Sequence, residues 1–214
     1  MKAGSQNKFL DYRTLRLLLG LVALSLPFAV SLISSTPLNS ISAAYYSEAK
    51  VVFIGLLLVF GALLLVYNGH SVAESRISKA ASIAAIIAVT FPAGCENCDS
   101  SISSQIHFIS SAVLFSILAY FCLVPFQKET RGTTGKRAMR SLVYRVCGWT
   151  MVACITGLLV ANMVLSGDTI NEFRLTYYGE TIALIAFGIA GIVSGKMSRL
   201  IAEEDELFNP FKIS

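Results

Sequence analysis

The chain has 214 residues, of which 55% are hydrophobic and 14% are charged, and its mean hydropathy is +0.67. Soluble domains carry about 25% charged residues, so this composition excludes an ordinary soluble globular protein. The formal net charge is +4, but the basic residues are not interleaved with aromatic residues as on a nucleic-acid-binding surface. We therefore expect a membrane protein that has membrane lipids, and no nucleic acid, as partners.

Six apolar blocks separated by short polar stretches predict six membrane-spanning helices, since each span needs about 20 apolar residues. In chain order they cover about residues 15–34, 50–68, 78–92, 105–126, 142–165 and 177–195. The first block lacks a small-residue cleavage site and is longer than the apolar core of a signal peptide, so we expect it to remain in the protein. The pattern predicts one all-α polytopic membrane domain over residues 1–214, a six-helix bundle.

Basic residues predict the orientation of this bundle, because loops rich in Lys and Arg stay on the cytoplasmic side. They gather before the first block, between the second and third, between the fourth and fifth, and after the sixth: Lys2, Lys8, Arg13, Arg16, Arg76, Lys79, Lys128, Arg131, Lys136, Arg137, Arg140, Lys196 and Arg199. The other three connections are mostly acidic or neutral. Both termini are therefore expected in the cytoplasm. The third block is short for a span, but we expect it to cross the membrane, because otherwise the loops on either side of it would break this charge asymmetry.

Polar residues from several blocks are expected to meet in one layer on the outer side. The candidate ligand-binding residues are Glu180, His107, Lys50, Tyr45, Tyr46, Ser40 and Ser42. Ionisable groups at membrane depth mark functional sites by default, so a shared polar pocket is one interpretation. The alternative is that the tyrosines form an interfacial belt, Lys50 snorkels, and His107 and Glu180 simply reach water.

A C-x-x-C pair, Cys95 and Cys98, lies in the outer connection that leads into the fourth block. An oxidising compartment favours a disulfide between them, or free thiols that pair with another protein. A zinc or copper site that uses Asp99 or His107 as a further ligand is a second interpretation, and thiol redox chemistry is a third. No cofactor is expected, with a metal as the weaker alternative.

Several segments, among them SISAAYYSEAKVVFIGLLLVFGALLLVYNG, IHFISSAVLFSILAYFCL and ETIALIAFGIAGIVSGK, resemble a family of bacterial six-span inner-membrane proteins with no assigned activity. More distantly, the histidine followed by a small residue and phenylalanine resembles the Frag/DRAM-like group of six-span membrane proteins. The resemblance implies residence in the inner membrane and places the family's loop serines and tyrosines, its histidine and its glutamate on the candidate residues named above. The chain departs from the family at Val51, where aspartate is usual, and at His70, where tyrosine is usual.

Three functions fit these patterns. The first is binding of a lipid headgroup or other amphipathic ligand in the outer pocket, alone or with a membrane-protein partner or a second copy of the chain. The second is a membrane-embedded lipid hydrolase, since Ser103 stands four residues before His107, although only two histidines are present for a metal. The third is a small proton-coupled transporter that titrates Glu180. Whether the protein is an enzyme stays open at this stage.

The orientation predicts where reporters fused to the chain will lie. Alkaline phosphatase fused after residue 100 should be active because the enzyme folds only outside the cytoplasm, and a fluorescent protein fused within 128–140 should be bright. Enzyme activity and fluorescence of intact cells measure the two outcomes. A cytoplasmic reporter at residue 100 would place His107 and the loop serines in opposite leaflets and rule out the shared pocket.

Overall fold

A computed structural model describes residues 12–93, 102–128, 130, 132 and 134–196 of the chain, and every regular element within these residues is a helix. The elements are α1 (Tyr12–Ile33), the short 3-10 helix η1 (Ser42–Tyr46), α2 (Lys50–Val66), α3 (Val72–Thr90), α4 (Ile102–Leu123), α5 (Gly135–Val164), α6 (Gly167–Glu172) and α7 (Leu175–Ser194). The all-α prediction is confirmed for the described residues.

Each of the six expected blocks coincides largely with one long helix, but not all of these helices are equally apolar. Helices α1, α4, α5 and α7 are long and apolar enough to cross a membrane, and α2 is a shorter apolar helix. Helix α3 begins at Val72 rather than near Ser78 and so includes the charged residues Glu74 and Arg76. Helix α5 begins at Gly135 rather than near Leu142, whereas α6 and η1 were not expected from hydropathy.

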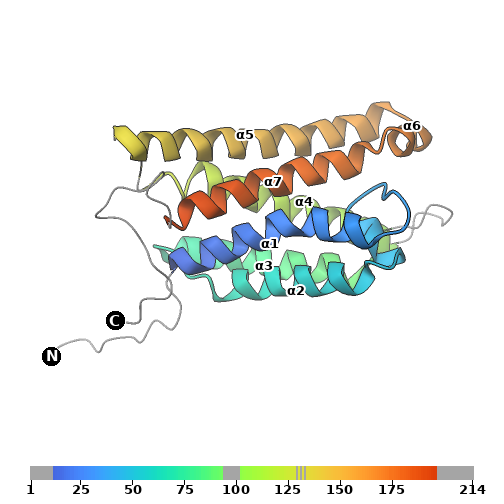
Figure 1. The fold of residues 1–214 in the computed structure, drawn as a ribbon, viewed down its shortest axis with the longest axis horizontal. Helices are drawn as coiled ribbons and strands as arrows, with labels where there is room; N and C mark the ends of the chain where they lie inside the picture. The colour runs from blue at the N-terminus through green and yellow to red at the C-terminus, as the bar shows by residue number, and fades with distance from the viewer. Residues whose placement is uncertain (1–11, 94–101, 129, 131, 133, 197–214) are drawn as a thin grey trace.

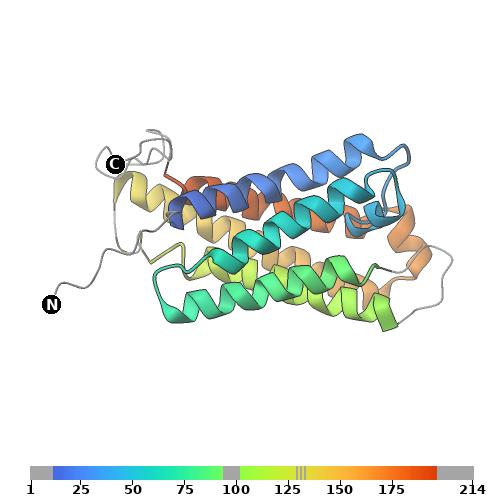
Figure 2. The ribbon, with the colours of Figure 1, turned by 90° about the horizontal axis from the view of Figure 1, so that it is seen from below.

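The six long helices run along one direction and form a closed ring (Figures 1 and 2). Consecutive helices pack side by side from α1 to α5, α5 packs against α7, and α7 closes the ring against α1. Helix α1 begins and α7 ends at the same end of the bundle, on the left in both figures. We refer to it as the Arg16 end and to the opposite end, where η1 lies, as the His107 end.

The ring closes because glycine lets α1 and α7 approach closely. A Cβ added at Gly20 would lie 2.7 Å from the carbonyl oxygen of Gly188, and one added at Gly191 would lie 2.7 Å from the Cα of Gly20. Such distances are too short for any side chain, so the two backbones are in direct contact. Small residues at helix contacts of this kind are typical of membrane bundles, where close packing replaces the hydrophobic effect.

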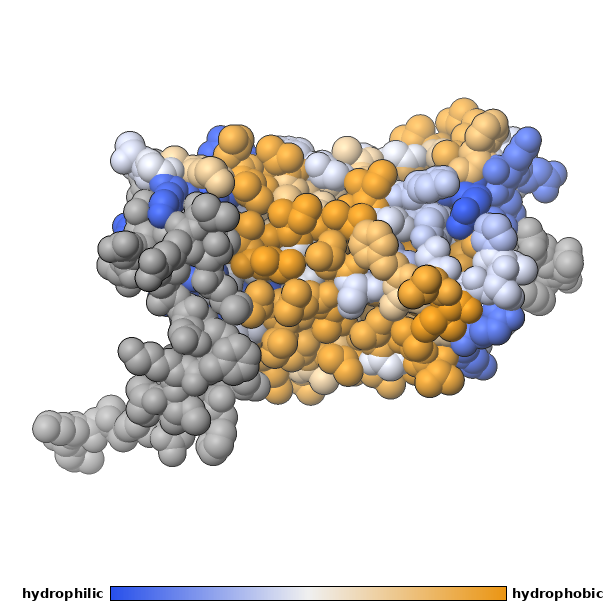
Figure 3. Space-filling view, in the orientation of Figure 1, coloured by the Kyte–Doolittle hydropathy of each residue, from blue (hydrophilic) through white to orange (hydrophobic). Residues whose placement is uncertain are grey.

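Hydrophobic side chains cover the middle of the face shown in Figure 3, and hydrophilic ones lie at both ends. Large exposed apolar residues occur on α1, α4 and α5, among them Phe28, Val113, Leu159 and Val160. A soluble monomer rarely exposes so broad an apolar surface. The distribution is that of a bundle whose middle contacts lipid.

Replacement of Gly191 by alanine should destabilise the bundle by about 1–3 kcal/mol, because the new methyl group forces the α1 and α7 backbones apart. Gly157 on α5 is the matched control, since no atom lies within 4 Å of the Cβ that alanine would add there. Thermal unfolding in mild detergent measures both variants. Equal melting temperatures for Gly191→Ala and Gly157→Ala would contradict the direct backbone contact.

Candidate functional site

A cavity of about 610 Å³ lies at the His107 end, between α4, α5, α7 and the connection from α1 to α2. We refer to it as the α4–α5 cavity. Its walls include Ser104, His107, Phe108, Ser111, Ala112 and Phe115 of α4; Ile155, Leu158, Leu159 and Asn162 of α5; Ile170 and Asn171 of α6; Thr176 and Glu180 of α7; and Ser40, Ser42, Tyr46 and Ser47 of the connection. Its volume is that of a site for a small organic ligand.

Glu180 is held in this cavity by the backbone of the α1–α2 connection. Its carboxylate accepts a 2.6 Å hydrogen bond from the N–H of Ile41, and the N–H of Ser42 also faces it. These amides stand at the start of η1, where helical N–H groups lack internal partners. Glu180 therefore caps η1 from a different helix, and its carboxyl group lies at the N-terminal end of that short helix, where a negative charge is favourable.

Two more contacts fasten the same connection to α7. The N–H of Tyr177 donates to the carbonyl oxygen of Asn39 over 3.0 Å, and Nε of Arg174 donates to the carbonyl oxygen of Leu38 over 2.7 Å. Arg174 adopts a left-handed backbone conformation (φ 49°) between α6 and α7. Arg174, Tyr177 and Glu180 thus hold the connection against the start of α7, and this attachment sets the position of the cavity's polar rim.

His107 is buried, with 5% of its surface exposed, and its imidazole ring is fixed by α3. Nδ1 lies 2.8 Å from the carbonyl oxygen of Ala88 and 2.9 Å from that of Phe91. Since both partners are acceptors, Nδ1 carries the proton, and Nε2 of the neutral ring is an acceptor. Nε2 lies 3.3 Å from Oγ of Ser111, one turn along α4. The ring thus presents a basic nitrogen beside a hydroxyl at the cavity wall.

A smaller cavity of about 50 Å³ continues from the α4–α5 cavity into the middle of the ring. The two share five lining residues: Ser42, His107, Ser111, Phe115 and Glu180. The residues that line only the smaller cavity are all apolar and include Leu26, Phe53 and Leu114. The shared polar side chains therefore lie between a larger cavity of mixed lining and a smaller, mainly apolar one.

The structure brings five of the candidate residues together and places two elsewhere. Ser40, Ser42, Tyr46, His107 and Glu180 line the α4–α5 cavity. The hydroxyl of Tyr46 donates to the carbonyl oxygen of Ala93 over 2.8 Å, and the Ser40 and Ser42 hydroxyls lie 3.1 Å apart.

Lys50 and Tyr45 do not line the cavity. The ammonium group of Lys50 lies 4.2 Å from the centroid of the Tyr45 ring, a cation–π contact at the start of α2. Cys95, Cys98 and Asp99 lie outside the described residues. Among the residues that are described, no three His, Cys, Asp or Glu side chains lie close enough to hold a metal ion. His107 and Glu180 alone would leave a metal two ligands short of the usual four.

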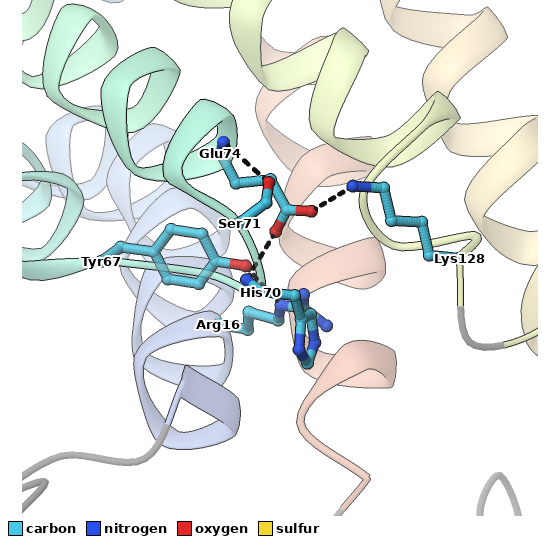
Figure 4. Close-up of polar contacts among 6 residues, drawn as sticks. All are labelled: Arg16, Tyr67, His70, Ser71, Glu74 and Lys128. Carbon is cyan, nitrogen blue, oxygen red and sulfur yellow. Dashed lines mark hydrogen bonds and ion pairs between the residues drawn. The ribbon is translucent and has the colours of Figure 1, made fainter. Parts of the chain in front are cut away.

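A second polar cluster, which hydropathy did not reveal, lies at the Arg16 end (Figure 4). The Arg16 guanidinium is 2% exposed; its Nε donates to the Tyr67 hydroxyl over 2.8 Å and its Nη1 to the Ser194 hydroxyl over 3.1 Å. Its Cζ lies 4.8 Å from the centroid of the Phe126 ring. Arg16 thereby joins α1 to the end of α2, the end of α7 and the turn after α4.

Glu74 is the acidic member of this cluster and is 1% exposed. It accepts hydrogen bonds from the backbone N–H of His70 over 3.0 Å and from Nζ of Lys128 over 2.6 Å. Burial alone raises the pKa of Glu74, but these hydrogen bonds and the charges of Lys128 and Arg16 outweigh it, so the pKa lies below its ordinary value of 4.5. The carboxylate is therefore ionised at neutral pH.

Local sequence already contains the signal for part of this cluster. Ser71 and Glu74 form the S-x-x-E pattern of a helix start, and the Ser71 hydroxyl accepts a hydrogen bond from the N–H of Glu74 as the N-cap of α3. Gly69 has a positive φ of 57°, and a Cβ there would lie 2.5 Å from Oε2 of Glu74. Only glycine lets the α2–α3 connection turn around the carboxylate.

No sequence pattern linked Ser111, Asn162 or Asn171 to the α4–α5 cavity.

The chain matches no protein-family model, and neither curated proteins nor solved structures include one that is detectably similar to it. The family resemblance inferred from the sequence therefore stays a prediction. The function has to be inferred from the geometry and charge of the α4–α5 cavity.

Replacement of Glu74 by glutamine should lower the free energy of unfolding at pH 7 by about 1–3 kcal/mol, since the charged hydrogen bond from Lys128 is lost. Because the pKa of Glu74 is lowered by folding, its contribution is present above about pH 4.5 and is lost as the pH falls further. The gap between the wild-type protein and Glu74→Gln should therefore close on acidification. Thermal unfolding in detergent from pH 7 to pH 3.5 measures this, with Glu172→Gln, at an exposed position on α6, as control. A gap that does not change with pH would contradict the role of the charge.

Proposed function

We propose that the chain crosses the inner membrane of a bacterium six times, with the Arg16 end in the cytoplasm. Support comes from the four long apolar helices, the apolar middle of the surface and the ring of six helices whose ends alternate (Figures 1 and 3). Basic residues such as Arg76, Lys128 and Arg137 gather at the Arg16 end, as expected for a cytoplasmic side. In this orientation the α4–α5 cavity lies near the outer surface of the membrane.

Within this topology, the protein binds an amphipathic ligand from the membrane in the α4–α5 cavity. The observation that carries the proposal is the mixed lining of the cavity. Apolar side chains of α4 and α5, among them Phe108, Ala112 and Leu159, form an apolar wall, whereas the polar lining groups include Ser111 and Asn162 of the same helices as well as Glu180. A ligand with a hydrocarbon chain and a polar head matches both kinds of lining, whereas a wholly polar solute would leave the apolar wall exposed to water.

The rim of the cavity supports entry from the lipid. Phe108 of α4 and Leu159 of α5 both line the cavity, and 48% and 50% of their surfaces are exposed. These two side chains give the cavity an exposed apolar surface between α4 and α5, next to the exposed Asn162. A hydrocarbon tail in the outer leaflet can therefore contact the cavity along Phe108 and Leu159.

Hydrolysis of such a ligand is a second candidate function, favoured by the contact between Ser111 and His107. Nε2 of His107, oriented through Nδ1, can take the proton of the Ser111 hydroxyl while the serine oxygen bonds to an acyl carbon. The imidazolium then returns that proton to the leaving alcohol, and water releases the acyl group as a fatty acid. The 3.3 Å separation is at the loose end of the range for such pairs. Ser103, which stands four residues before His107, does not line the α4–α5 cavity, and its hydroxyl donates to the carbonyl oxygen of Pro92 over 3.3 Å.

Replacement of Ala112 by phenylalanine should abolish ligand binding, because the added ring fills the apolar wall of the α4–α5 cavity. The neutral amphiphile monolauroylglycerol serves as probe, and equilibrium dialysis against the full-length protein in amphipol measures binding. Val113→Phe adds similar bulk at the next position of α4, which is 44% exposed and does not line the cavity. This control should bind the probe as the wild-type protein does.

Release of lauric acid in the same samples separates the two candidate functions. Stable binding without release supports a binding protein, whereas release that is lost in Ser111→Ala establishes hydrolysis. Failure of the wild-type protein to bind the probe, or equal binding by Ala112→Phe, would overturn the cavity as the ligand site.

A further inference from the structure

The described lining of the α4–α5 cavity has an acidic side chain but no Lys or Arg to pair with it. Among its described lining residues, Glu180 is the single carboxylate, and none is Lys or Arg. Of the basic side chains at this end, Lys50 lies over the ring of Tyr45 and Arg174 donates to the carbonyl oxygen of Leu38, and neither side chain lines the cavity. The carboxyl group of Glu180 therefore has no Lys or Arg partner among the described lining residues.

The hydrogen bonds that Glu180 accepts come from neutral donors. Its partners are the uncharged backbone amides of Ile41 and Ser42. Neutral donors hold the carboxylate in position but do not neutralise it, and an ionised carboxylate has about four acceptor sites. The remaining sites face a cavity that Glu180 lines from α7.

The neighbouring groups are also mainly acceptors or adaptable hydroxyls. His107 donates its only ring proton to α3, so Nε2 offers a lone pair. Ser42 and Ser111, which line both cavities, can accept or donate. A phosphate head would meet a carboxylate and a lone pair with no cation to balance its charge, which is unfavourable in a cavity of low dielectric constant.

We propose that the α4–α5 cavity selects amphiphiles whose head is a primary ammonium group, and that Glu180 is the counter-ion of that head. This inference rests on the proposed binding function and adds the class of ligand to it. The ammonium group donates to the Glu180 carboxylate, Nε2 of His107 and a serine hydroxyl, which matches its three protons. The single hydrocarbon chain lies along Phe108, Ala112 and Leu159 between α4 and α5.

Three probes with the same alkyl length but different heads test the proposal: dodecylamine, monolauroylglycerol and dodecyl phosphate. Each is dialysed at about pH 7.5, below its micelle concentration, against the full-length protein in amphipol, with empty amphipol as blank. Dodecylamine should bind with one-to-one stoichiometry and at least about 10-fold more tightly than dodecyl phosphate, the ratio expected for one charge-assisted contact. Monolauroylglycerol should lie between them.

Glu180→Gln keeps an oxygen for the Ile41 N–H but removes the charge. This variant should lose about 10-fold or more in dodecylamine affinity and bind monolauroylglycerol within about twofold of the wild-type protein. Glu172→Gln removes a carboxylate at the same end but outside the cavity. It should leave the order of affinities unchanged, which separates a contact from a general effect of surface charge.

Asn171→Lys keeps the test informative if Glu180→Gln does not fold. Asn171 is exposed at the cavity wall, and its backbone oxygen makes the turn contact to Arg174, so the side chain can change without loss of the fold. The added cation should weaken dodecylamine binding and strengthen dodecyl phosphate binding.

The outcomes distinguish the ligand class from the binding function itself. Equal or tighter binding of dodecyl phosphate by the wild-type protein, or unchanged dodecylamine binding in Glu180→Gln, would overturn the ammonium proposal. In either case, loss of monolauroylglycerol binding in Ala112→Phe would still support the cavity as a site for amphiphiles. Absence of binding for all three probes would overturn both.

Discussion

Helices α1 and α7 touch through their backbones, and most of the described structure depends on this contact. Gly20 faces Gly188 and Gly191 at distances that leave no room for a side chain. The first and last long helices are thereby joined, and a row of consecutive helices becomes a ring with an interior. Without this closure the apolar cavity in the middle of the ring, lined by α1, α2, α4 and α7, would not exist.

The two ends of the ring are secured by different chemistry. At the Arg16 end, the buried Arg16 donates to the hydroxyls of Tyr67 and Ser194, and the buried Glu74 accepts hydrogen bonds from the half-exposed Lys128 and from a backbone amide. At the His107 end, the carboxylate of Glu180 is held by backbone amides alone. Removal of one partner from a buried charge pair costs more than removal of a neutral contact. The Arg16 end is thus fixed by strong polar contacts, whereas Glu180 at the His107 end has no cationic partner among the described lining residues of the cavity, which is why we propose it as the contact for a cationic ligand.

In the proposed function, Glu180 combines a structural role with contact to the ligand. As the cap of η1 it orders the α1–α2 connection, and this connection supplies Ser40, Ser42 and Tyr46 to the cavity. The same carboxylate faces the cavity as its single negative group among the described lining residues. A group that builds a site and also contacts the ligand is difficult to replace, which is why the neutral glutamine, rather than alanine, isolates the effect of its charge.

Hydropathy along the chain located the long helices, because membrane spans are set by local composition over about 20 residues. It also placed His107 and Glu180 at the same end, since depth follows from position within a block. The boundaries of α3 and α5 were missed because charged residues such as Glu74 and Arg140 continue these helices beyond their apolar parts. The S-x-x-E pattern at Ser71 predicts where α3 begins, whereas no pattern in the neighbouring sequence predicts that Arg16 is buried.

By itself, then, the sequence determined the helical class, the apolar segments and the depth of the polar residues, all of which depend on neighbours along the chain. Tertiary structure alone decided that Lys50 turns to Tyr45, that Ser111 and Asn171 join Glu180, and that Arg16 reaches Ser194. These pairings join helices far apart in sequence, so they depend on how the ring closes. Closure is governed by the shape of two helix surfaces in contact, a property that no single segment contains.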